Sequence, residues 1–301
     1  MKIVLTGAGG FLGQNLIQTC ILLESDIEII ALSSQEQQLS LKYNDFKKWI
    51  TFYNSNEYHK INWEEIDILL NCAFPRNENG QQIATGLTYI SDILENAVSN
   101  GVKSVINISS QSVYSQIRED SADENTPLNL ESKYAIGKYA SELLVNKICK
   151  NIPHTNLRLA SLIGIGFDQR ITNKLVKQVI NHQDIQIVDG NQIFSFLDVR
   201  DAANALISVI LSSPKIWKET YNLGSSETYT LKELANAVVF IGKTRFNTDV
   251  DLLIQKDSSW KNLSMNCSRF YKDFNWRQVY RLQDTVNDLF LKEIKQRDLE
   301  L

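Results

Sequence analysis

A cluster of glycines near the N-terminus constrains this chain more than any other feature. The chain has 301 residues and only 13 glycines, yet four of them fall within seven consecutive residues, at Gly7, Gly9, Gly10 and Gly13. The apolar run Lys2–Thr6 precedes the cluster, and apolar residues at helical spacing follow it. A strand, a tight glycine turn and a helix in this order are typical of a loop that holds the phosphates of a dinucleotide.

Short apolar runs alternate with longer amphipathic stretches through the first half of the chain. Strands are expected at Lys2–Thr6, Ile27–Leu32, Ile50–Tyr53, Ile66–Asn71, Val105–Ser109 and Asn156–Ala160. Helical patterns between them cover about residues 84–99 and 131–148. Repeated β–α units whose strands are apolar throughout indicate a parallel sheet covered by helices on both faces. The sequence therefore predicts an α/β fold, with a doubly wound parallel sheet of the Rossmann type.

The pattern loosens after about residue 165, which divides the chain into two expected domains. We expect residues 1–165 to form the dinucleotide-binding domain and residues 166–301 to form a smaller substrate-binding domain. Segments at about 190–240 are expected to return to the first domain. In the second part, Thr230 and Glu233 form a capping box that predicts a helix to about Ile241.

Charge and cysteine usage exclude several other classes of protein. The 31 basic and 35 acidic residues give a net charge of −4, which argues against nucleic-acid binding. No apolar run approaches the ~20 residues of a membrane span, and the N-terminus leads directly into the first strand, so we expect no membrane segment and no signal peptide. Four dispersed cysteines and three dispersed histidines predict no disulfide framework and no metal site. We therefore expect a cytoplasmic protein.

The glycines follow the spacing G-x-x-G-x-x-G. Gly7 permits a tight turn, Gly10 lets the backbone approach a pyrophosphate, and Gly13 lets the helix pack closely on the strand. The N–H groups at the start of the helix, at Phe11 and Leu12, are expected to face the phosphates. These five residues are the expected phosphate-binding loop.

With the leading Thr6, this spacing resembles the extended short-chain dehydrogenase/reductase family, which includes sugar-nucleotide epimerases, dehydratases and ketoreductases. The resemblance implies a Tyr-x-x-x-Lys pair and an upstream serine or threonine. The pair occurs twice, and we interpret Tyr43–Lys47, in a polar stretch, as chance. Tyr134 and Lys138 lie near the start of the strong helical pattern, where their spacing puts both on one face. Ser110 lies 24 residues before Tyr134.

Further segments resemble landmarks of the family and occur in the family's order. Ser109–Tyr114 matches the family's Ser-Ser-x-x-Val-Tyr segment and aligns Ser110 with the catalytic hydroxyl. The other matching segments are Asn71–Ala73, Leu157–Gly164, Phe196–Asp201 and Tyr221–Gly224. The resemblance places Ala73 beside the cofactor.

The three candidate catalytic residues suit reduction of a carbonyl group. A ketone that accepts hydride develops alkoxide charge, so it needs a proton donor and a hydrogen-bond donor at its oxygen. We expect Tyr134 to donate the proton, with its pKa lowered by the Lys138 cation and by oxidised nicotinamide. Ser110 would bind the carbonyl oxygen, and Lys138 would also hold the nicotinamide ribose. Tyr134 and Lys138 are thus both expected to contact the cofactor. The alternative is a strand-end serine cluster and a packed helix tyrosine.

The end of the second expected strand bears on the choice of cofactor. An acidic residue there binds the ribose 2′-hydroxyl of NAD, but this chain has Ser33 and no acid until Glu36. A serine can hydrogen-bond a 2′-phosphate, so NADP is favoured and NAD stays possible. The cation would come from Lys42, Lys47 or Lys48.

Four positions depart from the family pattern on the substrate side. Gln111 and Ser112 stand where the dehydratases have Asp-Glu, which argues against 4,6-dehydration. Phe194 replaces an arginine, and Ser161 an asparagine, that bind the substrate diphosphate in many members. Arg170, Asn173 and Lys174 are possible replacement contacts, although we favour a solvated helix face for them.

The sequence thus predicts an NADP(H)-dependent ketoreductase that acts on a keto-sugar attached to a nucleoside diphosphate. An NAD-retaining nucleotide-sugar 4-epimerase is the alternative enzyme, and a non-catalytic dinucleotide-binding sensor is the alternative class. The intact Ser110, Tyr134 and Lys138 argue against a sensor, which needs no proton donor. The helices at about 84–99 and 131–148 resemble the pair that forms the family's homodimer, although the sheet offers their apolar faces another partner.

Overall fold

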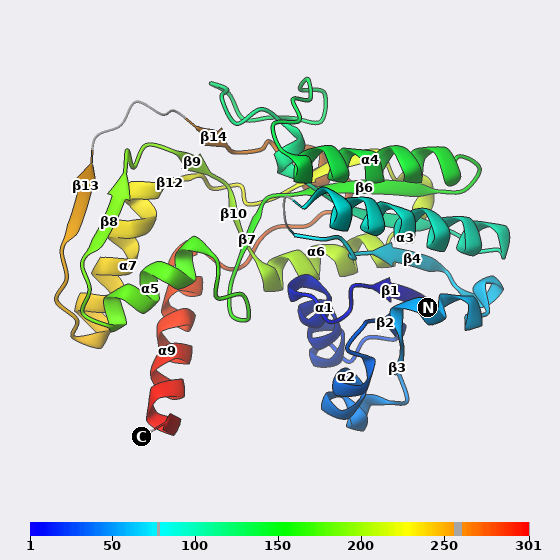
Figure 1. The fold of residues 1–301 in the computed structure, drawn as a ribbon, viewed down its shortest axis with the longest axis horizontal. Helices are drawn as coiled ribbons and strands as arrows, with labels where there is room; N and C mark the ends of the chain where they lie inside the picture. The colour runs from blue at the N-terminus through cyan, green and yellow to red at the C-terminus, as the bar shows by residue number, and fades with distance from the viewer. Residues whose placement is uncertain (77–78, 256–260, 301) are drawn as a thin grey trace.

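A computed structural model describes residues 1–76, 79–255 and 261–300. Its centre is a parallel sheet with the strand order β3-β2-β1-β4-β5-β6-β11 (Figure 1). The strands are β1 (Lys2–Thr6), β2 (Glu28–Leu32), β3 (Ile50–Tyr53), β4 (Ile68–Asn71), β5 (Val105–Ser110), β6 (His154–Leu159) and β11 (Thr220–Leu223). The order reverses between β1 and β4, which is the arrangement of a Rossmann-type doubly wound sheet. The predicted fold class is confirmed.

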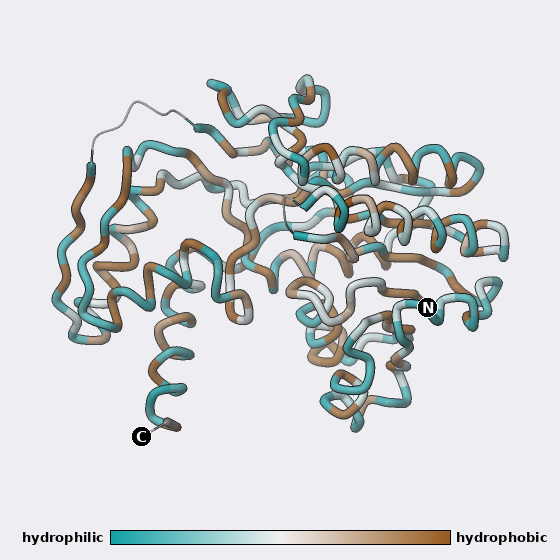
Figure 2. The backbone as a smooth tube through the Cα atoms, in the orientation of Figure 1, coloured by the Kyte–Doolittle hydropathy of each residue, from teal (hydrophilic) through white to brown (hydrophobic). Residues whose placement is uncertain are grey.

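Helices cover both faces of this sheet. Helices α1 (Phe11–Leu22) and α6 (Val199–Leu211) pack on one face, and α3 (Gly80–Ser99) and α4 (Lys133–Ile148) pack on the other. Val4 joins the core beneath α3, whereas its neighbours on β1 join the core beneath α1, because successive side chains point to opposite faces. Hydrophobic and hydrophilic bands alternate along α3 and α4 (Figure 2), as expected for helices with one face on a sheet.

A second, smaller hydrophobic core lies beside the sheet. Three helices build it: α5 (Ile171–Ile180), α7 (Leu231–Phe246) and α9 (Leu282–Glu300). Short strands complete it: β7 (Ser161–Ile163) with β10 (Phe196–Asp198), β8 (Ile185–Val188) with β13 (Leu252–Gln255), and β9 (Ile193–Phe194) with β12 (Tyr229–Thr230) and β14 (Asn262–Leu263). In the described part of the chain, no helix is both long and apolar enough to cross a bilayer.

The chain passes between the two cores more than once. After β10 it returns to the sheet as α6 and β11, and α8 (Ser268–Asp273) packs on β11. Helix α7, by contrast, packs with α5 and α9 in the smaller core. We retain a division near residue 165 as a proposal, with residues 199–223 as the main segment that returns.

Candidate active site

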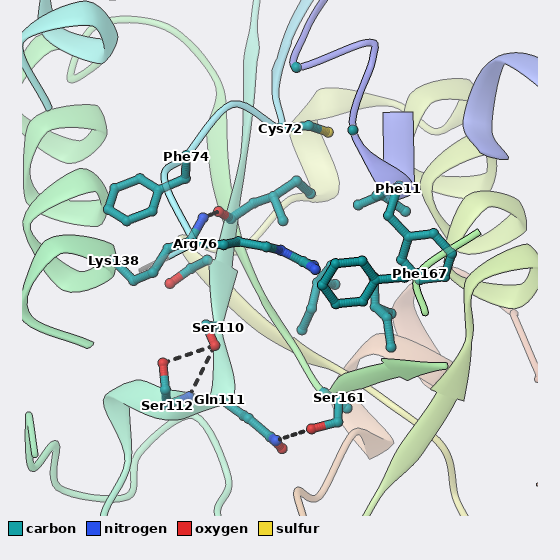
Figure 3. A pocket seen from close by; sticks show the side chains of 18 of the residues that line it. Phe11, Cys72, Phe74, Arg76, Ser110, Gln111, Ser112, Lys138, Ser161 and Phe167 are labelled. Atoms are coloured by element: carbon teal, nitrogen blue, oxygen red, sulfur yellow. Dashed lines mark hydrogen bonds between the residues drawn. The ribbon is translucent and has the colours of Figure 1, made fainter. Parts of the chain in front are cut away.

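A cavity of about 830 Å³ opens at the carboxyl ends of the central strands. Its lining includes Gly7 after β1, Ala73 after β4, Ser110 at the end of β5 and Ala160 after β6. The segment around Phe167, before α5, forms the opposite wall (Figure 3). Ligands of doubly wound sheets bind at this edge of the sheet, at the point where the strand order reverses.

The glycine loop has no room for side chains at its critical positions. Gly7 has a φ of +66°, and a Cβ built there would lie 2.9 Å from the backbone nitrogen of Ala73. A Cβ on Gly13 would lie only 2.4 Å from the carbonyl oxygen of Gly7. The Gly10 N–H donates to that same oxygen at 2.9 Å, which closes the turn. The loop therefore presents bare backbone to the cavity.

The start of α1 fits a phosphate group. Gly10 caps the helix without a side-chain hydrogen bond, and the first turn contains no acidic residue. The N–H groups at Phe11 and Leu12 thus lie at a positive helix end without a side-chain cap, on the cavity wall. These are the conditions under which helix N-termini bind phosphates.

Thr6 joins the glycine loop to the next loop of the site. Its Oγ1 donates to Asn71 Oδ1 at 2.7 Å and accepts hydrogen bonds from the backbone of Cys72 and Ala73, both at 3.1 Å. Thr6 is fully buried. Thr6 therefore does more than mark the family's glycine motif, because its hydroxyl fixes the position of Ala73.

Ser33 lies directly against the glycine loop. It follows β2, is 5% exposed, and its Oγ accepts a hydrogen bond from the Gln35 N–H at 3.0 Å. A Cβ built on Gly9 would lie 2.8 Å from that Oγ. The ammonium of Lys42 is held close by, because it donates to Gln14 Oε1 in the first part of α1 at 2.7 Å.

The three candidate catalytic residues all line the cavity. Ser110 ends β5, and its Oγ accepts hydrogen bonds from the N–H and the hydroxyl of Ser112, at 3.2 and 2.9 Å (Figure 3). Tyr134 and Lys138 come from the first two turns of α4, which Ser132 caps by accepting from the Ala135 N–H. The edge of the sheet and one helix thus bring the three side chains together.

Lys138 is buried at the base of the cavity. Its Nζ donates to the carbonyl oxygen of Ile108 at 2.7 Å and lies 4.4 Å from the ring centroid of Phe74. Burial lowers the pKa of Lys138 to about 7, because a charged amine is poorly solvated there. The nearby Cys72 thiol has a pKa raised to about 12 by its burial, which fits a packed cysteine with no acid–base role.

Lys138 is not among the groups that shift the pKa of Tyr134 in the described structure, so the lowering expected from Lys138 and oxidised nicotinamide stays a prediction. Burial raises the pKa of the Tyr134 phenol above its ordinary value, and the largest opposing influence is Arg76, followed by a hydrogen bond with Ser110 and the charge of Arg170. Lys138 is bonded to Ile108 instead. Electrostatic stabilisation of the phenolate therefore comes from two arginines that the family motif does not contain.

Two positions that depart from the family pattern contact each other. The Gln111 side-chain amide donates to the Ser161 hydroxyl at 3.0 Å, across the cavity floor (Figure 3). Phe194, the third departure, is absent from the described lining of the cavity and stacks on Phe196 with 5.0 Å between ring centroids. No sequence pattern indicates that Gln111 and Ser161 contact each other.

The candidate replacement contacts after β7 separate into three different environments. Arg170 lines the cavity, so the solvated helix face expected for it is wrong. Asn173 is buried and its side chain donates to the Gly164 carbonyl at 3.3 Å. Lys174 is exposed, as expected for a solvated face.

The sheet order and the glycine loop define a Rossmann-type fold with a loop suited to binding a dinucleotide. Residues 3–224 match the model of the NAD dependent epimerase/dehydratase family, so the chain belongs to that family. Membership also makes it an enzyme of the oxidoreductase or epimerase type, as predicted.

Proteins with similar sequences match most of the chain at low sequence identity. The uncharacterized UDP-glucose epimerase YtcB of Bacillus subtilis (strain 168) is 24% identical, over 88% of this chain and 90% of its own length. A dTDP-4-dehydro-6-deoxyglucose reductase of Escherichia coli is 21% identical, over 97% of both chains. A solved structure with a similar fold is that of UDP-glucuronic acid 4-epimerase from Bacillus cereus, in complex with UDP-glucuronic acid and NAD. It superposes on this chain with a TM-score of 0.83 at 19% sequence identity, and the superposition covers 99% of this chain and 100% of that one.

Proposed function

We propose that this protein is an NADP(H)-dependent ketoreductase that acts on a keto-sugar linked to a nucleoside diphosphate. The observation that carries the proposal is the end of β2, where Ser33 contacts the glycine loop and no carboxylate takes the place of the acid that selects NAD. NADP(H) suits an enzyme that exchanges its cofactor at each turnover, whereas a 4-epimerase retains and recycles its NAD.

The cofactor choice rests on the groups beside Ser33. The one acid close in sequence, Glu36, accepts a hydrogen bond from the Asn54 side chain at 3.0 Å. The Ser33 hydroxyl and the Lys42 ammonium supply a hydrogen-bond donor and a positive charge for a 2′-phosphate. Of the three lysines considered, Lys42 is the one bonded to α1, and Lys48 instead lies over the Trp49 ring at 5.4 Å.

The residues of the cavity can perform the proton transfer that carbonyl reduction needs. A bound nicotinamide would supply the hydride. The raised pKa of Tyr134 keeps the phenol protonated at neutral pH, which is the state that can donate to a developing alkoxide. Ser110 is placed to donate to the same oxygen, since Ser112 already supplies the hydrogen bonds that its Oγ accepts. Lys138, in its protonated form, would hold the nicotinamide ribose.

A nucleotide-sugar 4-epimerase is the second candidate. Several relatives, including YtcB, carry the name UDP-glucose epimerase, and an epimerase would use the same Ser110, Tyr134 and Lys138. It would differ in taking hydride from the sugar carbon that bears the hydroxyl, while Tyr134 takes the hydroxyl proton, and in returning the hydride to the other face of the resulting ketone. The non-catalytic sensor considered from sequence is disfavoured, because the proton donor and its partners are all placed in the cavity.

The two enzymes are separated by cofactor consumption. We would incubate the protein with NADPH or NADH and keto nucleotide sugars, beginning with a 4-keto-6-deoxy sugar, and follow absorbance at the nicotinamide band. Stoichiometric loss of NADPH supports the reductase. Interconversion of 4-epimeric nucleotide sugars without net cofactor use would replace it with the epimerase.

We further propose a homodimer formed through α3 and α4. These helices pack against each other on the sheet, and Ile136 and Leu143 on α4 are 53% and 50% exposed. Exposed apolar side chains on one helix are a surface that a second copy can cover. Sedimentation at several protein concentrations tests this, and a monomer at all of them would contradict it.

A further inference from the structure

Two arginines from distant parts of the chain converge on one aromatic ring in the cavity. The guanidinium of Arg76 lies 4.6 Å from the ring centroid of Phe167, and that of Arg170 lies 5.1 Å from it. Arg76 follows β4 and Arg170 caps the start of α5. Figure 3 shows the Arg76 side chain reaching across the cavity from the side of Phe74 and Lys138 to the ring of Phe167.

Neither guanidinium has an anionic partner among the residues that the structure describes. No ion pair or hydrogen bond joins Arg76 or Arg170 to a described side chain, and Arg170 Nε is buried without a hydrogen-bond partner. The two guanidinium charges repel each other. Burial, and then the charge of Arg76, lower the pKa of Arg170 to about 10. Like charges held close together are costly, so an anion bound between them would relieve the repulsion.

The rest of the described cavity lining does not supply that anion. It contains four cations (Arg76, Arg118, Lys138 and Arg170) and no aspartate or glutamate. Arg118 and Lys138 are already bonded to backbone carbonyls, the former to Ser115 and Ser264 and the latter to Ile108. Arg76 and Arg170 are the two cations of the described lining that no hydrogen bond holds to a described residue.

The arginine pair lies between the catalytic residues and the glycine loop. Phe74, two residues before Arg76, contacts the ring of Tyr134 edge-on with 5.7 Å between centroids. Phe167 stacks on Phe11 of the glycine loop, with 5.6 Å between centroids. The charges of Arg76 and Arg170 both act to lower the pKa of Tyr134, so an anion held between them would lie near that phenol.

We propose that Arg76 and Arg170 form a clamp for a carboxylate on the sugar, so that the substrate is a nucleotide-activated uronic acid. This rests on the proposed nucleotide-sugar function and narrows it. Guanidinium groups present paired N–H donors that match the two oxygens of a carboxylate, and Phe167 keeps both planes oriented. A uronic acid carries its carboxylate directly on a ring carbon, within a few bonds of a reacting carbonyl.

Calorimetric titration with UDP-glucuronate and UDP-glucose tests the clamp, because the two probes differ only at C6. Titrations use the full chain with saturating NADP⁺, as wild type and as Arg76→Met, Arg170→Met and Arg76→Lys. Arg245→Met is the control, since it removes the same charge from the exposed face of α7, outside the cavity. We expect wild type to bind UDP-glucuronate roughly 10- to 100-fold more tightly than UDP-glucose. Either methionine variant should remove most of that preference, and Arg76→Lys should lose less.

The other outcomes overturn the clamp in distinguishable ways. Equal binding of both probes by wild type contradicts it while leaving the nucleotide-sugar function intact. If Arg76→Met and Arg170→Met bound both probes more weakly by the same factor, the arginines would be assigned to the substrate diphosphate. If the variants bound only NADP⁺ more weakly, measured by a separate titration, the arginines would be assigned to the cofactor pyrophosphate. Binding of neither probe would overturn the proposed function and the clamp with it.

Discussion

The cofactor wall and the substrate wall of the cavity are held together in different ways. On the cofactor side, a ladder of buried side chains crosses four adjacent strands: Thr6 to Asn71 at 2.7 Å, Asn71 to Asn107 at 2.9 Å, and Asn107 to Asn156 at 2.9 Å. On the substrate side, side chains from separate segments meet through single contacts, such as Gln111 with Ser161. Buried and satisfied networks fix geometry, so the cofactor wall is the rigid one.

This difference indicates where substrate specificity can change with little loss of folding stability. Replacing a residue of the buried ladder leaves an unsatisfied polar group, which costs about 1–3 kcal/mol. Replacing Arg76, whose side chain is exposed overall and contacts a ring, disturbs no buried hydrogen bond. Substrate preference can therefore vary between relatives while the cofactor wall stays the same.

The largest expected effect separates chemistry from cofactor binding. Tyr134→Phe removes the proton donor and should lower kcat by about 10²- to 10⁴-fold, with the Kd for NADPH unchanged, because the phenol hydroxyl is not part of the phosphate cradle. Steady-state kinetics and fluorescence titration of NADPH measure the two quantities. Tyr139→Phe, on the same helix outside the cavity lining, is the matched control. Full activity of Tyr134→Phe would refute the mechanism.

The second effect concerns the base of the cofactor wall. Lys138 has a pKa lowered to about 7 by burial, so it loses its proton as the pH rises through that value in the free enzyme. If the cation holds the cofactor ribose, kcat/KM for NADPH should be full below pH 7 and should fall above it, by up to about tenfold per pH unit. Lys138→Arg, which stays charged, should flatten the profile. A wild-type profile that is flat from pH 6 to 9 would contradict the role of Lys138.

The third effect tests the rigidity of the glycine loop. A Cβ at Gly13 would lie 2.4 Å from the Gly7 carbonyl oxygen and 2.9 Å from Ala8 Cα, both backbone atoms. Gly13→Ala should therefore lower the free energy of unfolding by about 1–3 kcal/mol and weaken NADPH binding by roughly tenfold, as read by denaturant titration and fluorescence. Gly80→Ala is the control, since a Cβ there meets nothing within 4 Å. Equal effects at the two glycines would show that the loop tolerates movement.

The same contrast explains what the sequence could predict. The parallel sheet is predicted by the alternation of apolar strands and amphipathic helices. Ser110 and the Tyr134–Lys138 pair follow from local spacing, because a strand end and one helix face bring them to the same edge of the sheet. Arg76 and Arg170 carry no such pattern. They are 94 positions apart, and only the packing of Phe167 brings them together. The raised pKa of Tyr134 cannot be predicted from the motif either, because it depends on how deeply the phenol is buried in the folded chain.

The smallest expected effect concerns the outer edge of the cofactor wall, where cofactor choice is decided. Lys42 is exposed, so its interaction with a 2′-phosphate is screened by solvent and should be worth about 1 kcal/mol or less. Lys42→Ala should therefore lower kcat/KM for NADPH by roughly 2- to 5-fold and leave NADH unchanged. The loss should shrink in high salt, because the Debye length falls to about 3 Å at 1 M. Lys48→Ala is the comparison, since its ammonium lies over the Trp49 ring. If Lys48→Ala changed the ratio of kcat/KM for NADPH to kcat/KM for NADH and Lys42→Ala did not, the cation at this edge would be Lys48. The hydrogen bond from Lys42 to Gln14 would then only connect α2 (Glu36–Lys42) to α1.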